Sequence, residues 1–361
     1  MTKTIMTILL AAGLPVLAIM LGSCTEDPAV EYDPTPYALA VGNFPDAPIP
    51  PDNKLTNAGV ELGRMLFYEK LLSGDGSQAC ADCHVQADAF TDLDRFSLGI
   101  QNLEGRRQAM VIFNMAWHDE GFSWDGRAQR LRDQALMPIQ DPLEMDETLE
   151  NVINKLSEVQ DYRDQFVRAF GSEEINEINI SLALEQFMNS IISKDSKWDR
   201  FLAGTETLTE SEERGRSLFF NEFDPFGLVR GAECFHCHGG FNFTNNALMN
   251  NGLDSDLEFT DLGLFEVTGL DEDKAKFKVP SLRNIALTPP YMHDGRFATL
   301  EEVIDHYDLG VEESSTVDPL MQYNLEPGLG LTTQEKADLI AFMKTLTDDV
   351  FLNNPQYSSP F

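Results

Sequence analysis

Two copies of one short pattern constrain the fold of this chain more than any other feature. Residues 80–84 read CADCH and residues 234–238 read CFHCH. Both match C-x-x-C-H, the attachment sequence of c-type haem, in which two cysteines bond the haem covalently and the histidine binds its iron. The sequence therefore predicts two covalently bound haem c groups. The predicted cofactor-binding residues are Cys80, Cys83, His84, Cys234, Cys237 and His238, with His84 and His238 as the proximal iron ligands.

Cysteine usage supports this interpretation. The chain has five cysteines, and four of them lie in the two motifs. A zinc site built from two C-x-x-C pairs is one alternative, but the pairs lie far apart in the chain and zinc does not require a histidine after each pair. A thioredoxin-like redox pair is another alternative, but neither motif is flanked by the βαβ pattern of that fold.

The beginning of the chain is typical of an exported lipoprotein. Residues 1–23 contain Lys3 followed by an apolar run, and the sequence LGSC that ends at Cys24 resembles a bacterial lipobox. We expect a signal peptide that is cleaved before Cys24 and a lipid attached to the Cys24 sulfur; a short transmembrane helix is the alternative. Residues 24–52 are rich in proline and acid and predict a linker. The expected location is the periplasm or the outer membrane, with membrane contact only through the lipid.

The charge of the chain limits its partners. The formal net charge is −34 at pH 7. This argues against nucleic acid, because neutralising phosphates requires an excess of lysine and arginine. A small basic electron-donor protein would be attracted by such a field, although an acidic surface can also serve solubility alone.

A short repeat precedes each haem motif. Residues 63–68 read GRMLFY and residues 215–220 read GRSLFF. Each segment predicts an amphipathic helix that leads into its haem loop. We therefore predict two cytochrome c-like haem domains, at 53–205 and 206–350, followed by a tail at 351–361.

Other segments also have the periodicity of helices. Apolar residues spaced by three and four predict helices over 148–170 and 178–202. Further helices are predicted at 300–307, where Thr299 and Glu302 fit a capping box, and at 333–346. Strand signals are few and short, so the predicted fold class is mostly α.

Two sets of motifs lie outside the haem loops. The first set is WDGRA at 124–128, Gln134, and PLEM at 142–145; the second is FKVPSLRN at 277–284 and PYMHDG at 290–295. In content, order and spacing they resemble the motifs of bacterial di-haem cytochrome c peroxidases, a family that includes MauG-like enzymes, which oxidise residues of a partner protein. The resemblance covers nearly the whole chain after the linker. It implies a peroxidatic haem at His84 and an electron-transfer haem at His238.

The resemblance also implies catalytic residues. Glu144 and Gln134 match the distal residues of the family. A carboxylate near the iron can take a proton from one peroxide oxygen and deliver it to the other, and an amide can orient the peroxide. Trp124 matches a tryptophan between the two haems, where an indole would shorten the electron-transfer path. The structural alternatives are a solvated loop acid for Glu144, a surface residue for Gln134 and a core residue for Trp124.

Many members of the family carry a loop histidine that blocks the peroxidatic iron until the other haem is reduced. In this chain Ile100 stands at that position, and His118, the one histidine between His84 and Trp124, comes too late in the sequence. This departure suggests that the first iron is open at rest, as in MauG-like enzymes.

Two further ligand sets are implied by the resemblance. Tyr307 stands where MauG-like proteins carry a tyrosine as sixth ligand of the second iron, and the axial ligand is a main determinant of haem potential. Rival ligands are Met292, His306 and Met321. A calcium ion between the domains would use the carbonyls of Thr288 and Pro290, with Gln108 where the family usually has asparagine.

These observations predict a di-haem enzyme that reduces hydrogen peroxide to water. Its electron donor is expected to be a cytochrome c, a cupredoxin or a quinol-linked protein. A first alternative is MauG-like oxidation of residues in a partner protein. A second, from a different class, is a non-enzymatic electron carrier in which both irons have six ligands. The resemblance also allows a homodimer.

Overall fold

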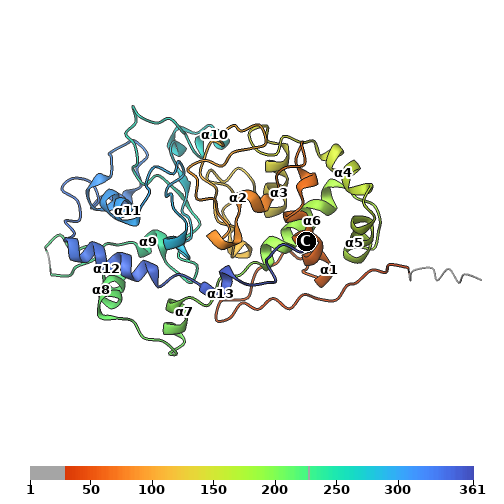
Figure 1. The fold of residues 1–361 in the computed structure, drawn as a ribbon. Coiled ribbons are helices and arrows are strands. Elements are labelled where there is room, and N and C mark those ends of the chain that lie inside the picture. Colours follow the sequence, from red (N-terminus) through yellow and green to blue (C-terminus); the bar gives the residue numbers. More distant parts are fainter. Residues whose placement is uncertain (1–28, 227) are drawn as a thin grey trace, which may run out of the picture. The chain divides into compact units, whose positions relative to one another are not determined.

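The computed structural model describes residues 29–226 and 228–361, and residues 31–361 form one compact unit (Figure 1). The unit is mostly helical, which confirms the predicted fold class. The elements before the second haem motif are α1 (Asn57–Phe67), α2 (Cys80–Cys83), α3 (Leu131–Gln140), α4 (Leu149–Ser157), α5 (Gln160–Phe170), α6 (Glu177–Ser190), α7 (Lys197–Leu202) and α8 (Glu210–Phe220). The elements after it begins are α9 (Phe235–His238), β1 (Leu248–Met249), α10 (Phe265–Thr268), β2 (Phe277–Lys278), α11 (Leu300–Asp305), α12 (Thr333–Lys344) and α13 (Asp349–Leu352).

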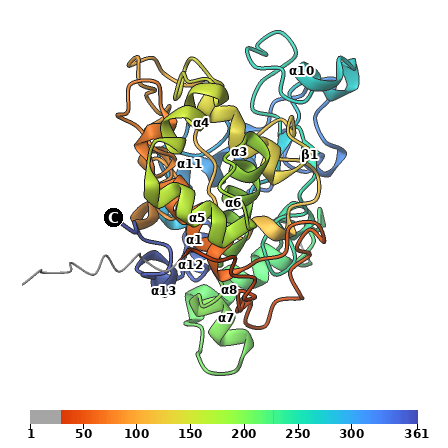
Figure 2. The same ribbon diagram turned by 90° about the vertical axis from the view of Figure 1, so that its right-hand side faces the viewer.

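The first hydrophobic core forms where α1 packs against α5 and α6 (Figure 2). The Thr56 side chain caps α1 by accepting a hydrogen bond from the Gly59 N–H. Leu62 and Leu66 lie four residues apart on one face of α1, and both are fully buried. The second hydrophobic core gathers aromatic rings around Phe342 of α12, whose ring centroid lies 5.2 Å from that of Phe219 in α8.

The glycine of the sequence repeat has the same role in both copies. A methyl group at Gly63 would lie 2.0 Å from the carbonyl oxygen of Ala183 in α6, and one at Gly215 would lie 1.9 Å from that of Asp338 in α12. Only a residue without a side chain allows two helices to approach so closely. The repeat therefore marks a helix crossing beside each haem motif, α1 on α6 and α8 on α12.

Two of the predicted helices are in fact interrupted. The segment 148–170 forms α4 and α5, because the chain leaves the helix after Ser157 and Val159 is extended. The segment 178–202 forms α6 and α7, and the residues between them are held by a distant carboxylate. Asp348 accepts hydrogen bonds from the backbone N–H groups of Lys194 and Asp195, which would otherwise continue the helix.

The other predicted helices agree better with the structure. Thr299 and Glu302 form the expected capping box of α11, which ends at Asp305 and continues as a single π-helical turn to Gly310. The helix predicted at 333–346 is α12.

The predicted linker and tail both contact the first core. Tyr37, Leu39 and Ile49 pack against it, so residues 31–52 differ from the free tether that their composition suggested. At the other end of the chain, Tyr357 is buried and its hydroxyl accepts a hydrogen bond from the Ile192 N–H at 3.2 Å. Apolar contacts and hydrogen bonds, such as the one from the Tyr37 N–H to the Leu55 carbonyl at 3.0 Å, therefore hold both segments against the core. The domain limits at 205 and 350 stay predictions.

The strands β1 and β2 form a short antiparallel ladder. The Lys278 N–H of β2 donates a hydrogen bond to the Trp124 carbonyl at 2.7 Å, which joins the segment before α3 to the second half of the chain. In the described part of the chain, no helix has both the length and the apolar character needed to cross a membrane.

Candidate active site

A cavity of about 470 Å³ is lined by residues from both haem motifs and from both sets of motifs that resemble those of the di-haem peroxidases. His84 and His238 line it, together with all four motif cysteines, whose thiols are free. Glu144, Gln134, Trp124 and Tyr307 line the same cavity. Residues that are far apart in the sequence are thus brought together around one space.

The two motif histidines have the same geometry. Nδ1 of His84 lies 3.1 Å from the Phe90 carbonyl oxygen, and Nδ1 of His238 lies 3.2 Å from that of Phe243. A hydrogen bond donated by Nδ1 leaves the lone pair on Nε2, which is the tautomer that binds a metal. Burial lowers the pKa of both imidazoles, that of His238 to about 4, so both are neutral.

This donor set fits c-type haem. Each motif presents two free thiols for thioether bonds and one oriented neutral imidazole for an iron, and both sets face a cavity that is lined mainly by apolar side chains. His236, inside the second motif, lies outside this set: its Nε2 contacts Glu222 Oε2 at 3.1 Å near the surface.

Glu144 follows α3 and faces the cavity. The Glu144 side chain is exposed where it opens onto the cavity, yet the protein packed around its carboxyl disfavours the charged form and is the main reason that its pKa rises to about 7. The nearby charge of Asp141 raises the pKa further, and Arg127 lowers it. A carboxyl with a pKa near neutrality can both accept and release a proton under physiological conditions.

Gln134 lies on the cavity side of α3 rather than on the free surface. Its Oε1 accepts a hydrogen bond from the Ser123 hydroxyl at 2.5 Å. This bond fixes the orientation of the amide, so that its Nε2 is the end that remains available as a donor. Ser123 has a positive φ of 67° and directly precedes Trp124. Sequence reasoning did not identify Ser123 as a residue that orients Gln134.

The loop between Asp92 and Gln108 passes over the cavity. Ser97, Leu98 and Gly99 line the cavity from this loop, and none of their side chains is an imidazole or a thioether. Ile100 stands at the expected histidine position, and its backbone N–H donates a hydrogen bond to the Glu144 carbonyl at 2.9 Å. The loop is therefore connected to the segment that carries the acid.

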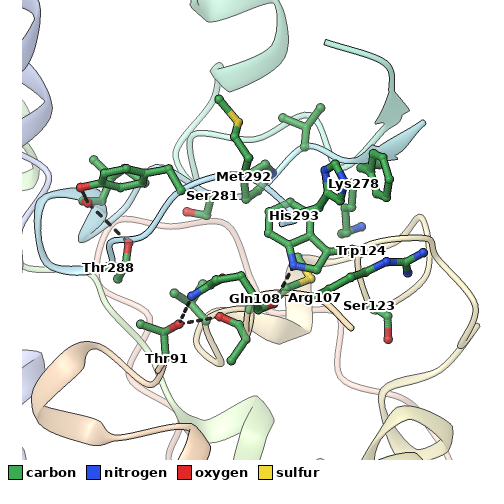
Figure 3. A pocket seen from close by; sticks show the side chains of 18 of the residues that line it. Thr91, Arg107, Gln108, Ser123, Trp124, Lys278, Ser281, Thr288, Met292 and His293 are labelled. Atoms are coloured by element: carbon green, nitrogen blue, oxygen red, sulfur yellow. Dashed lines mark hydrogen bonds between the residues drawn. The ribbon is translucent and has the colours of Figure 1, made fainter. Parts of the chain in front are cut away.

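Trp124 lies where the two halves of the chain meet (Figure 3). Its Nε1 donates a hydrogen bond to the Gln108 carbonyl at 2.8 Å, and its own carbonyl accepts one from the Lys278 N–H. The ring packs in a small cluster with Phe277, which stacks on His293 with ring centroids 3.6 Å apart. The tryptophan is thus a buried residue that also lines the cavity.

Three of the four candidate sixth ligands of the second iron line the cavity: Tyr307, Met292 and Met321. Nδ2 of Asn251 donates a hydrogen bond to Tyr307 Oη at 3.0 Å and contacts Met292 Sδ at 3.5 Å. Burial raises the pKa of Tyr307 to about 12. In His306, by contrast, both ring nitrogens lie 3.1 Å from backbone carbonyl oxygens, so neither nitrogen is directed to the cavity.

The residues named for calcium line the cavity as well. The Gln108 amide donates hydrogen bonds to Thr91 Oγ1 at 3.0 Å and to the Asp92 carbonyl at 3.1 Å (Figure 3). Thr288 and Pro290 lie on the opposite segment, which reaches Gln108 through a hydrogen bond from the Gln108 N–H to the His293 carbonyl. A calcium ion here stays a prediction.

An arginine not anticipated from the sequence connects the two halves. Arg107 is almost fully buried and pairs with Asp125 at 2.6 Å and with Asp261 at 2.7 Å. Asp125 belongs to the WDGRA motif, and it also pairs with Arg127. The presence of Asp125 in the motif indicates that a cation lies nearby. That this cation includes Arg107, which is distant in the sequence, depends on the fold.

Comparisons with known proteins agree with this geometry. A family model described as di-haem cytochrome c peroxidase matches residues 57–207. The chain is 34% identical over 301 residues to the methylamine utilization protein MauG of Methylorubrum extorquens, covering 83% of this chain and 81% of that protein. It is 33% identical over 307 residues to cytochrome c551 peroxidase of Nitrosomonas europaea, covering 84% of each.

A solved structure is similar over nearly its whole length. It is a MauG-like protein associated with microbial copper homeostasis, with 37% sequence identity and a TM-score of 0.80, covering 88% of this chain and 97% of that one. Both the identity and the coverage extend well beyond the haem motifs. The chain therefore belongs to the family of di-haem cytochrome c peroxidases, which includes the MauG-like proteins.

Proposed function

We propose that this protein reduces hydrogen peroxide to two molecules of water, using two electrons from another protein and two protons. Haem bound at His84 would supply an iron that reacts with peroxide, and haem bound at His238 would relay single electrons. The family supports peroxidase or MauG-like chemistry in general. The assignments of individual residues below are part of the proposal.

Glu144 is the proposed proton shuttle. Its carboxylate accepts the proton of the peroxide oxygen nearer to the iron, and the resulting acid returns the proton to the departing oxygen. Gln134 Nε2, oriented by the Ser123 hydroxyl, donates a hydrogen bond that holds the peroxide or the product water. Trp124, with its indole fixed by the Gln108 carbonyl, provides the path by which electrons cross between the halves.

The observation that carries the proposal is the position of Glu144: a carboxyl with a pKa of about 7 in the same cavity as the His84 imidazole. The test is peroxide consumption by the haem-loaded protein with a reduced small redox protein as donor. We expect two donor molecules oxidised for each peroxide consumed. A protein that only exchanges electrons with the donor and leaves the peroxide unchanged would instead be an electron carrier.

MauG-like oxidation of a partner protein is the second candidate. Two observations favour it: Ile100 in place of the loop histidine, and Tyr307 beside the second motif. The names of the relatives include MauG as well as cytochrome c peroxidase. In this case the electrons come from side chains of the partner. Mass spectrometry of co-purified or co-encoded proteins after peroxide addition would then show a loss of hydrogen or a gain of oxygen, without any added donor.

The location and the donor complete the proposal. The protein is exported and held at a membrane by a lipid on Cys24; this residue lies outside the described residues. Its donor is a small cytochrome or cupredoxin. A calcium ion bound near Gln108, Thr288 and Pro290 and a homodimeric state are further parts of the proposal.

A further inference from the structure

Lys278 is a buried cation that forms no ion pair with any residue that the structure describes. Its side chain is only 2% exposed, and Nζ donates one hydrogen bond, to the Asn246 carbonyl at 3.2 Å. Among the described residues, no carboxylate lies within ion-pair distance of it. An ammonium group that is removed from water without a partner is strongly destabilised.

Within residues 29–226 and 228–361, the other buried cations named here are paired. Arg283, which is 1% exposed, binds Asp199 at 2.7 Å, and Arg107 binds two aspartates. Arg132 pairs with the buried Glu185 at 2.8 Å. Lys278 is therefore an exception among them, and it lines the cavity that contains both haem motifs.

A second polar group near Lys278 is incompletely bonded. Nε2 of His118 is buried without a hydrogen-bond partner, and this histidine also lines the cavity. Burial, and to a lesser extent the charge of Lys278, lower the pKa of His118 to about 3. The two residues come from opposite halves of the chain and line the same cavity, and Figure 3 shows Lys278 near Trp124, whose carbonyl accepts a hydrogen bond from the Lys278 N–H.

The Lys278 ammonium group remains largely protonated at neutral pH in this cavity. Burial lowers the pKa of Lys278 to about 8, and the charges of Asp119 and Glu120 oppose this shift. At neutral pH the cavity thus contains a cation and a neutral imidazole with an unused nitrogen. Together they fit an anion with more than one acceptor oxygen, such as a carboxylate.

Haem brings such an anion, because the macrocycle carries two propionate side chains. We propose that Lys278, with His118, binds a haem propionate at the junction of the two halves. Lys278 is then a positioning residue: the ion pair places one edge of the haem next to Trp124, and its positive charge raises the reduction potential of that haem. This inference depends on haem attachment and not on peroxide chemistry, so failure of the peroxide assay leaves it intact.

The experiment compares K278M, which keeps the length of the side chain but removes its charge, with K278R, which keeps the charge. K276M is the matched control, since Lys276 lies on the same segment and already pairs with Asp273 at 3.1 Å. The midpoint potentials of both haems are measured by spectroelectrochemistry. We expect K278M to lower one potential, K278R to restore most of it, and K276M to change neither. The haem whose potential shifts is the one whose propionate is bound.

A second measurement does not depend on the folding of a variant. A crystal structure of the haem-loaded wild-type protein should place Lys278 Nζ within hydrogen-bond distance, about 3 Å, of a propionate oxygen. A distance beyond about 4 Å to every propionate oxygen, or equal potentials in K278M and wild type at full haem content, overturns the proposal.

Discussion

The backbone N–H of Ile100 donates a hydrogen bond to the carbonyl of Glu144 at 2.9 Å. Ile100 occupies the place of the expected loop histidine, and Glu144 is the proposed proton shuttle. The loop in this chain is therefore connected to the backbone of the segment that carries the proposed proton shuttle.

The first prediction concerns Glu144→Gln. The amide keeps the shape of the side chain but does not accept a proton, so kcat/KM for peroxide should fall by ~10²- to 10⁴-fold. Steady-state peroxide turnover measures this. Glu150→Gln, an exposed residue at the start of α4, is the control and should retain full activity. A rate for Glu144→Gln within twofold of wild type would remove this residue from the mechanism.

The pH dependence of peroxide turnover provides a second prediction. The pKa of Glu144 is raised to about 7, mainly by burial, and the ionised form is the one that accepts a proton. The value of kcat/KM should therefore fall about tenfold per pH unit below pH 7 and level off above it. In the Glu144→Gln variant, this decrease of kcat/KM below pH 7 should be absent. If the same decrease persists in the variant, another group is responsible for the pH dependence.

The third prediction concerns Gly99→Ala. A methyl group at Gly99 would lie 2.1 Å from the Leu143 carbonyl oxygen and 2.6 Å from that of Glu144. The loop and the acid segment must separate, so we expect a loss of about 1–3 kcal/mol in the free energy of unfolding together with slower peroxide turnover. Denaturant titration and kinetics measure the two effects.

Gly105→Ala is the control for this change, because it lies in the same loop and its nearest atom would be 3.6 Å away. We expect it to alter the free energy of unfolding by less than about 0.5 kcal/mol. Equal behaviour of the two variants would contradict the close contact at Gly99.

The fourth prediction concerns Tyr307→Phe. If the Tyr307 oxygen is the sixth ligand of the second iron, its removal should change the spectrum of the low-spin haem and leave that of the high-spin haem unaltered. Electron paramagnetic resonance of the oxidised protein separates the two signals. Tyr323→Phe, which changes another tyrosine of the second half, should leave both signals as in wild type. An unaltered low-spin signal in Tyr307→Phe would favour Met292 or Met321.

Much of the site could be predicted from the sequence because its determinants are local. The C-x-x-C-H motifs specify the spacing of thiols and imidazole, and the capping box at Thr299 and Glu302 specifies the start of α11. The repeated glycines, Gly63 and Gly215, were visible as a repeat, although their role in helix crossing became clear only in the structure.

The remaining features depend on partners that are distant in the sequence. Asp348 interrupts the helix predicted over 178–202 by binding the N–H groups of residues 194 and 195, and no local pattern reveals this. The same holds for Arg107 with Asp261 and for the unpaired Lys278, since an ion pair or its absence is a property of the folded chain. Sequence periodicity predicts which residues are buried. It does not predict the ion-pair or hydrogen-bond partner of each buried charged side chain.

The most direct test of the proposed function is a titration of the fully oxidised, haem-loaded protein with hydrogen peroxide, without any prior reduction, followed by optical spectroscopy. With Ile100 in place of a blocking histidine, the high-spin haem should change its spectrum at once and stoichiometrically with the peroxide added. A protein that remains spectrally unchanged until it is reduced, or that shows two low-spin haems unable to bind cyanide, would contradict an open iron site beneath Glu144.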